Sequence, residues 1–118
     1  MNLVIYWTII INSTKDGVIN TTIDFILSQL GNKSLSITKS EVYWKDKTKH
    51  QIELKQSIEL IPSIDLVKVK LIDTIEKISS NWNINIVSLS HQNFDVSATT
   101  ENLPKNEIHW VGFSAEIN

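Results

Sequence analysis

The stretch Leu3-Val4-Ile5-Tyr6-Trp7-Thr8-Ile9-Ile10-Ile11 decides the fold class of this 118-residue chain. Apolar side chains occupy both alternating faces of the run, and β-branched and aromatic residues dominate it. Such a run is typical of a central strand that is covered on both sides. It is too short to cross a bilayer, which takes ~20 apolar residues, and no small-residue cleavage site follows it. We therefore expect a buried strand in a cytoplasmic protein that does not bind membranes.

Two strand–helix–strand units and further strands can be read outward from this stretch. The predicted elements are a helix over residues 14–30, a strand over 35–44, a hairpin loop over 45–50, a strand over 52–60, a helix over 63–79, strands over 81–90 and 94–98, a polar loop over 99–106 and a final strand over 107–117. This order predicts an α+β fold. We expect a ferredoxin-like βαββαβ order in one domain, residues 1–118, with a mostly antiparallel sheet, both helices on one face and extra C-terminal strands that extend the sheet.

The clearest alternation lies in the strand over residues 52–60. Ile52, Leu54, Ile58 and Leu60 alternate with Glu53, Lys55, Ser57 and Glu59, and only Gln56 interrupts the apolar side. Such alternation predicts one buried face and one face that meets solvent or a partner. In the preceding strand the alternation blurs around residues 39–41, which predicts a bulge there.

The sequence also predicts where the two helices begin and end and which of their residues face the core. Ser13 and Asp16 have capping-box spacing, Gly31 is placed to end the first helix in a left-handed conformation, and Ser63 is the expected cap of the second helix. The predicted core stripes are Ile19, Ile23, Ile26, Leu27 and Leu30 in the first helix, and Ile64, Val67, Leu71, Ile75 and Ile78 in the second. Leu66 and Val69 lie off the second stripe, so they are candidates for an interface or for contact with the extra strands.

Composition excludes several classes of function. The chain has no cysteine, which rules out disulfides, thiolate metal sites and cysteine nucleophiles. All 11 basic residues are lysine, and the formal net charge is −2, so we expect no nucleic-acid partner. The histidines, His50, His91 and His109, are scattered, and we expect no metal site and no cofactor.

Motifs of enzymes and of other families with this element order are missing. The chain has no GxGxxG, P-loop or GxSxG sequence, no arginine for an acylphosphatase-like loop, no paired cysteines and no RNA-binding signature on residues 52–60. We therefore expect no enzyme, although a small hydrolase or isomerase stays an alternative. A regulatory domain that binds a small ligand near residues 12–17 and forms a homodimer through its sheet is the other alternative.

The four tryptophans divide into two pairs. Trp7 and Trp82 suit the core, whereas Trp44 stands at a hairpin and Trp110 lies on the final strand. Exposed aromatic anchors among polar residues are typical of binding hot spots. The alternative is that Trp44 and Trp110 cover the second face of the sheet.

In size, mild acidity, lack of cysteine and element order, the whole chain resembles the small immunity proteins of bacterial contact-dependent growth inhibition. The resemblance implies a non-enzymatic protein that captures a cognate toxin, often a nuclease, in a heterodimer and occludes its active site. Phage-encoded inhibitors of host defence are similar in the same outline. A mildly acidic surface suits a basic nuclease, because complementary potentials speed encounter. The candidate contact residues are Trp44, Asp46, Glu53, Glu59, Glu101 and Trp110.

Overall fold

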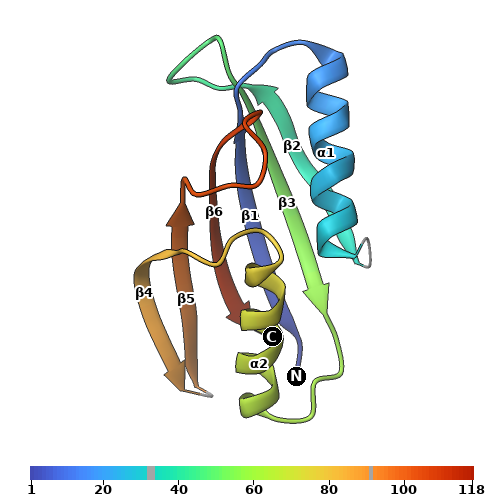
Figure 1. Cartoon of the computed structure of the whole chain (residues 1–118). Coiled ribbons are helices and arrows are strands. Elements are labelled where there is room, and N and C mark those ends of the chain that lie inside the picture. The colour runs from blue at the N-terminus through green and yellow to red at the C-terminus, as the bar shows by residue number, and fades with distance from the viewer. Residues whose placement is uncertain (32–33, 91) are drawn as a thin grey trace.

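A six-stranded sheet carries two helices in the computed structural model, which describes residues 1–31, 34–90 and 92–118 (Figure 1). The elements are β1 (Leu3–Ile11), α1 (Asp16–Leu30), β2 (Leu35–Val42), β3 (His50–Ile58), α2 (Ile64–Glu76), β4 (Asn83–Ser90), β5 (Asn93–Thr100) and β6 (Ile108–Ile117). Both helices lie on the same face of the sheet (Figure 1). The predicted α+β class is therefore confirmed.

The strand order is β2-β3-β1-β6-β5-β4, and all neighbouring strands are antiparallel. A ferredoxin-like order would place β4 beside β1, but β6 takes that place and β4 lies at the far edge. The two strands differ accordingly in burial: β6 carries the buried Val111, Phe113 and Ala115, whereas β4 is exposed along its length. The C-terminal strands do extend the sheet, as expected, but the last of them lies at its centre.

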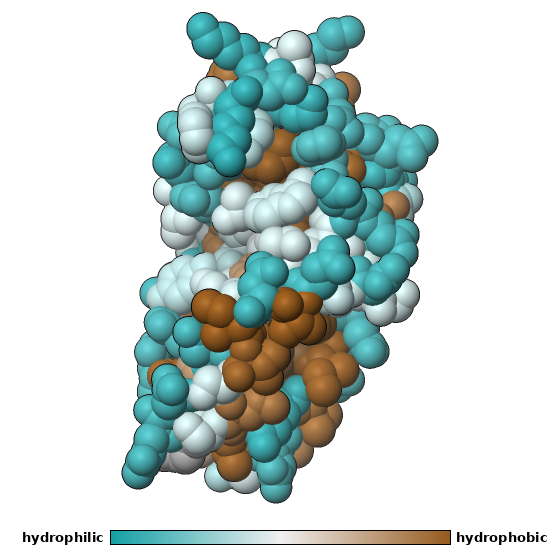
Figure 2. Space-filling model, turned by 90° about the vertical axis from the view of Figure 1, so that its left-hand side faces the viewer, coloured by the Kyte–Doolittle hydropathy of each residue, from teal (hydrophilic) through white to brown (hydrophobic). Residues whose placement is uncertain are grey.

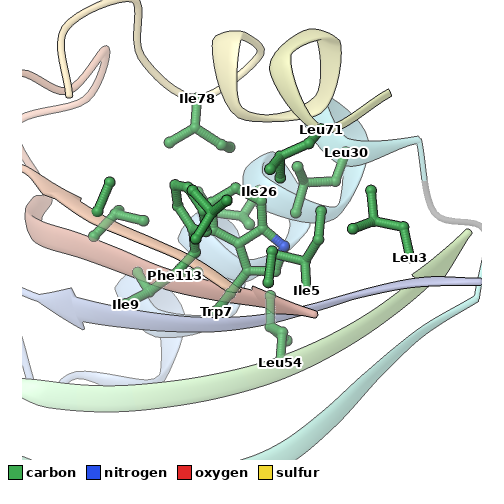
Figure 3. Packing of buried hydrophobic residues seen from close by; sticks show 14 of the residues in the cluster. Leu3, Ile5, Trp7, Ile9, Ile26, Leu30, Leu54, Leu71, Ile78 and Phe113 are labelled. Carbon is green, nitrogen blue, oxygen red and sulfur yellow. The ribbon is translucent and has the colours of Figure 1, made fainter. Parts of the chain in front are cut away.

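The core lies between the sheet and the two helices (Figure 3). Every second residue of β1 points into it: Leu3, Ile5, Trp7, Ile9 and Ile11 are all buried. Burial of an aliphatic side chain of this size contributes about 1.5–3 kcal/mol. Both predicted helix stripes are confirmed, since all their members are buried or pack against this cluster.

Gln56, which interrupts the apolar alternation, is a buried member of the core side of β3. The indole N–H of Trp7 donates to its side-chain oxygen at 3.0 Å. Phe113 packs against two indoles, with ring centroids 5.6 Å from Trp7 and 5.1 Å from Trp82. Trp7 and Trp82 therefore belong to the core, as predicted.

Two of the three predicted helix-end residues are confirmed. Gly31 has a φ of 87°, and the Oγ of Ser63 accepts from the backbone N–H of Leu66 at 3.3 Å. The prediction for Ser13 is wrong: α1 begins at Asp16, and its cap residue, Lys15, makes no side-chain capping bond. Ser13 Oγ instead accepts from the backbone N–H of Lys15 at 3.1 Å, which forms a turn before the helix.

Several strand positions differ from the predictions. β3 ends at Ile58, because Leu60 takes a left-handed conformation with a φ of 57° and is 88% exposed. The irregularity in β2 falls between Ile37 and Lys39, slightly earlier than expected. α2 ends at Glu76, three residues before the predicted end.

β4 also departs from its predicted pattern. A register shift between Ile84 and Ile86 turns the strand, so Ile84 shares the helix-bearing side of the sheet with Val87 and Leu89, while Ile86 points to the other side. Strict alternation along the strand would instead place Ile84 and Ile86 on one side and Val87 and Leu89 on the other.

Candidate functional site

The face of the sheet opposite the helices is the first candidate surface, and we call it the helix-free face. Its centre is formed by the alternate residues of β1, which are Val4, Tyr6, Thr8 and Ile10. Val4 and Ile10 are buried by their neighbours on the same face, whereas Tyr6 is 40% exposed. The two-sided apolar character of β1 thus needs no second layer from the C-terminal strands, which lie beside β1 and not over it.

Tyr6 and Glu116 form a polar contact across β1 and β6. The phenol O–H donates to the Glu116 carboxylate at 3.1 Å. This hydrogen bond raises the pKa of the Tyr6 phenol, and the nearby carboxylate charge raises it further. Tyr6 therefore stays protonated and acts on this face as a hydrogen-bond donor with an exposed ring.

Trp110 and Gly112 shape the neighbouring part of the helix-free face. The two residues lie on β6 with one residue between them, and the indole of Trp110 lies over Gly112. A Cβ added at Gly112 would come within 2.5 Å of the Trp110 ring, so only glycine leaves room for this position of the indole. In this position over Gly112, Trp110 is half-buried, and part of its side chain is exposed to solvent.

Charged side chains surround these aromatic residues. The strand register places Glu41 and Lys39 of β2, Glu53 and Lys55 of β3, Asp95 of β5 and Glu116 of β6 on the helix-free face. Lys39 Nζ lies 3.1 Å from Glu41 Oε1, and this contact raises the pKa of Lys39. Both partners are exposed, so the pair contributes little to stability. The face has four carboxylates and two lysines and is therefore acidic.

Of the predicted contact residues, the structure brings Glu53 and Trp110 onto the same face. Glu53 lies opposite Thr8 in the β1–β3 ladder, and Gly112, beneath the Trp110 ring, lies opposite Thr8 in the β1–β6 ladder. The two predicted residues thus lie on the two sides of the central strand. Gln51 Nε2 donates weakly to Glu53 Oε1 at 3.4 Å, which leaves the carboxylate available to other donors.

Trp44 and Asp46 lie in the loop between β2 and β3. Trp44 is 74% exposed, and the Lys45 ammonium lies 5.0 Å from the centre of its ring. Asp46 accepts from the backbone N–H and the hydroxyl of Thr48 at 3.0 and 2.6 Å, and from Lys49 Nζ at 2.7 Å. The bonds to Lys49 and Thr48 hold the pKa of Asp46 far below its usual range. Asp46 therefore shapes the loop, while Trp44 is its exposed anchor.

Glu59 does not join this group. Glu59 follows the end of β3, where Ile58 pairs with the first residue of β1, whereas the loop with Trp44 lies beside the last residue of β1. At ~3.4 Å per residue, the length of β1 separates these two ends by about 27 Å. Glu101 is exposed and follows Thr100, which pairs with Val111, the neighbour of Trp110 on β6, so Glu101 lies near Trp110. The expectation that Glu59 lies on the polar strand face with Glu53 is wrong, because the strand ends before it.

Tyr6, Glu41, Asp95 and Glu116 belong to the helix-free face but were not among the predicted contacts. Alternation places each of them on one side of its own strand. That these sides coincide depends on β6 lying between β1 and β5, which no local pattern in the sequence reveals.

A cleft of about 770 Å³ opens on the other side of the sheet, between the end of α1, the end of β3 and α2. Its lining includes Gln56, Glu59, Lys70, Asp73 and Lys77, so it presents both charges around a buried amide.

The two described histidines lie on β3 and β6. His50 Nε2 lies 2.8 Å from Ser40 Oγ, His109 is exposed on β6, and His91 lies outside the described residues. Within the described part of the chain, no three histidines, cysteines or carboxylates are grouped in a way that could hold a metal ion. Within residues 1–31, 34–90 and 92–118, which the structure describes, neither α1 nor α2 is long and apolar enough to cross a membrane.

Comparison with protein-family models, with curated proteins and with solved structures finds no significant match for this chain.

Proposed function

We propose that this chain is a cytoplasmic, non-enzymatic binding protein that neutralises a protein toxin by occluding its active site. This is the function of the contact-dependent growth inhibition immunity proteins that the chain resembles in outline. In this view the sheet is a variant of the ferredoxin-like arrangement, with β2-β3-β1 in their usual order and β6 in the fourth place.

The observation that carries the proposal is the helix-free face. Its centre combines the exposed part of Tyr6 with Trp110, and charged side chains surround both. Interfaces use this arrangement, in which a few aromatic anchors supply most of the binding energy and a polar rim supplies specificity. Trp44 adds a third exposed aromatic residue from the adjoining loop.

The charge of the face favours a basic partner. Four carboxylates and two lysines give it a negative potential, which speeds the encounter with a positively charged surface such as the substrate groove of a nuclease. Because the residues lie on strands of a packed sheet, they are held in place before binding, which lowers the entropy cost of association.

Capture on the immobilised chain from the native host, followed by coexpression with the captured protein, tests the proposal. We expect the captured protein to be toxic alone and harmless when coexpressed. Glu53→Lys and Trp110→Ala should each abolish protection. Glu59→Lys makes the same charge change away from the helix-free face and should leave protection intact. If coexpression gives no protection, the toxin assignment is wrong; if Glu59→Lys is as damaging as Glu53→Lys, the assignment of the face is wrong.

The cleft of about 770 Å³ supports a second candidate function, a small-ligand-binding regulatory domain. Lys70 and Asp73 offer both charges that a zwitterionic ligand needs, and Gln56 offers an amide. A rise of the melting temperature with an amino acid, lost in Lys70→Ala, would favour this function over toxin binding.

A further inference from the structure

β4 is an edge strand that lacks the charged residues by which such strands are commonly protected against pairing. Its sequence, Asn83–Ser90, contains no charged residue, whereas β2 at the other edge carries Lys39 and Glu41. Natural edge strands are commonly protected by charges, because their outward backbone groups are free to pair with another chain. Ile84, Ile86, Val87 and Leu89 are nevertheless exposed along β4.

The helix-bearing side of this edge is apolar. We call its exposed residues Ile84, Val87 and Leu89 the β4 edge patch; Val69 and Ile72 are exposed on α2, which lies on the same side of the sheet. Figure 2 shows the hydrophobic side chains gathered in one area on the side of the molecule that carries β4. The three side chains of the β4 edge patch are between 39% and 55% exposed.

We propose that a second copy of this chain covers the β4 edge patch, with the two β4 strands paired antiparallel around a two-fold axis. Identical strands that pair antiparallel are related by such an axis, so the interface is self-complementary. The neutral strand makes no charge repulsion against itself, and it offers nothing by which a charged partner could be selected. Pairing of the two β4 strands adds backbone hydrogen bonds to the contact between these apolar side chains.

The shape of β4 specifies the register. The shift between Ile84 and Ile86 confines regular pairing to residues 86–90, whose midpoint is Ser88. A two-fold axis at Ser88 places Val87 opposite Leu89 of the second copy on the helix-bearing side, and therefore joins the two apolar patches. It also makes one continuous sheet through both copies.

The dimer leaves the proposed binding face unobstructed. Pairing through β4 extends the sheet at its edge, while Tyr6 and Trp110 lie on the central strands β1 and β6. The two helix-free faces then point to the same side of the joined sheet. Dimer formation does not depend on the toxin proposal, and the two can be tested separately.

Sedimentation of the full chain from about 1 µM to about 500 µM tests the association. We expect the mass to rise from 13.5 kDa toward twice that value. Val87→Lys should weaken the dimer at least tenfold, because it places like charges at the interface. Ile37→Lys makes the same change at a similarly exposed position of the other edge strand, β2, and should leave the dimer intact. A monomer at every concentration, or equal effects of the two variants, overturns the proposal.

Ser88→Cys tests the register directly. Opposed residues in an antiparallel pair have Cα atoms about 4.5–5.5 Å apart, which a disulfide can span. Since the chain has no cysteine of its own, any covalent dimer formed on mild oxidation comes from the introduced thiol. Ser97→Cys lies on the same face of β5, inside the sheet, and should give far less covalent dimer. Equal crosslinking of both variants overturns the two-fold axis at Ser88.

Discussion

The indole N–H of Trp7 donates a 3.0 Å hydrogen bond to the side-chain oxygen of Gln56, and both side chains are buried between the sheet and the helices. The bond joins β1 to β3 inside an otherwise apolar cluster. A buried donor without a partner costs more free energy than the bond itself contributes, so each residue depends on the other.

Replacement of Gln56 by Leu should lower the free energy of unfolding by about 1–3 kcal/mol, because the indole N–H of Trp7 then stays buried without an acceptor. In a Trp7→Phe background the same replacement should cost clearly less. Urea denaturation of both single variants and the double variant measures this coupling. Gln51→Leu, on the opposite face of β3, is the matched control. Additive losses would show that the hydrogen bond does not couple the two residues.

Gly112→Ala should destabilise the chain by about 1–3 kcal/mol, because the new methyl group meets the Trp110 ring at 2.5 Å. In a Trp110→Ala background the space is open, and the cost should largely disappear. Gly17→Ala is the contrasting change: nothing lies within 4 Å of its added Cβ, it lies in α1, and it should stabilise by about 0.4–1 kcal/mol. Thermal denaturation of the single and double variants measures these changes in stability. An equal loss for Gly112→Ala in the wild-type and Trp110→Ala backgrounds would contradict this account.

The two helix caps should respond in opposite directions. Ser63→Ala removes the acceptor for the Leu66 N–H and should cost about 1 kcal/mol. Lys15→Ser supplies a capping hydroxyl where α1 has none and should stabilise by about 0.5–1 kcal/mol. Helix content and melting temperature, followed by circular dichroism, check both changes. A loss of stability in Lys15→Ser would show that the turn at Ser13 already serves as the cap.

Asp46 should make stability sensitive to acid. Its pKa is lowered in the folded chain by Lys49 and Thr48, so the carboxylate contributes stability that is fully present above the unfolded pKa of about 4. That contribution is lost as the pH falls through the lowered folded pKa. Asp46→Asn should therefore be less stable than the wild type at pH 7, and the difference should shrink below pH 4. Unfolding curves between pH 7 and pH 2.5 measure it; a difference independent of pH would exclude this linkage.

Local patterns predicted the elements and the core more accurately than the arrangement of the strands. Helix stripes such as Ile19, Ile26 and Leu30 repeat every three or four residues and need no distant information. The position of β6 beside β1 depends on pairings between residues about a hundred positions apart, such as Trp7 with Phe113. Nothing in the local sequence of β4 excludes it from that place.

For the candidate surface too, local patterns predicted the direction of single side chains but not which of them lie together. Alternation identified Glu53 as outward-facing. That Glu53 lies on the same face as Trp110 follows only from the strand pairings on the two sides of Thr8. The wrong placement of Glu59 has a local cause: the left-handed conformation at Leu60 ends the extended backbone, although the side chains continue to alternate in the sequence.

The pairing of β1 with β6 at the centre of the sheet also sets an order of events during synthesis. β1 is synthesised before the other strands of the sheet, and one of its edges has no partner until β6 has been made. Strand pairings so distant in sequence form slowly, because the entropy of closing a long loop is lost before the contacts between the strands contribute any stability. A nascent chain that stalls before Ile108 would present a long apolar strand edge to chaperones and proteases. The time needed to complete β6 therefore sets how long this edge of β1 stays unpaired.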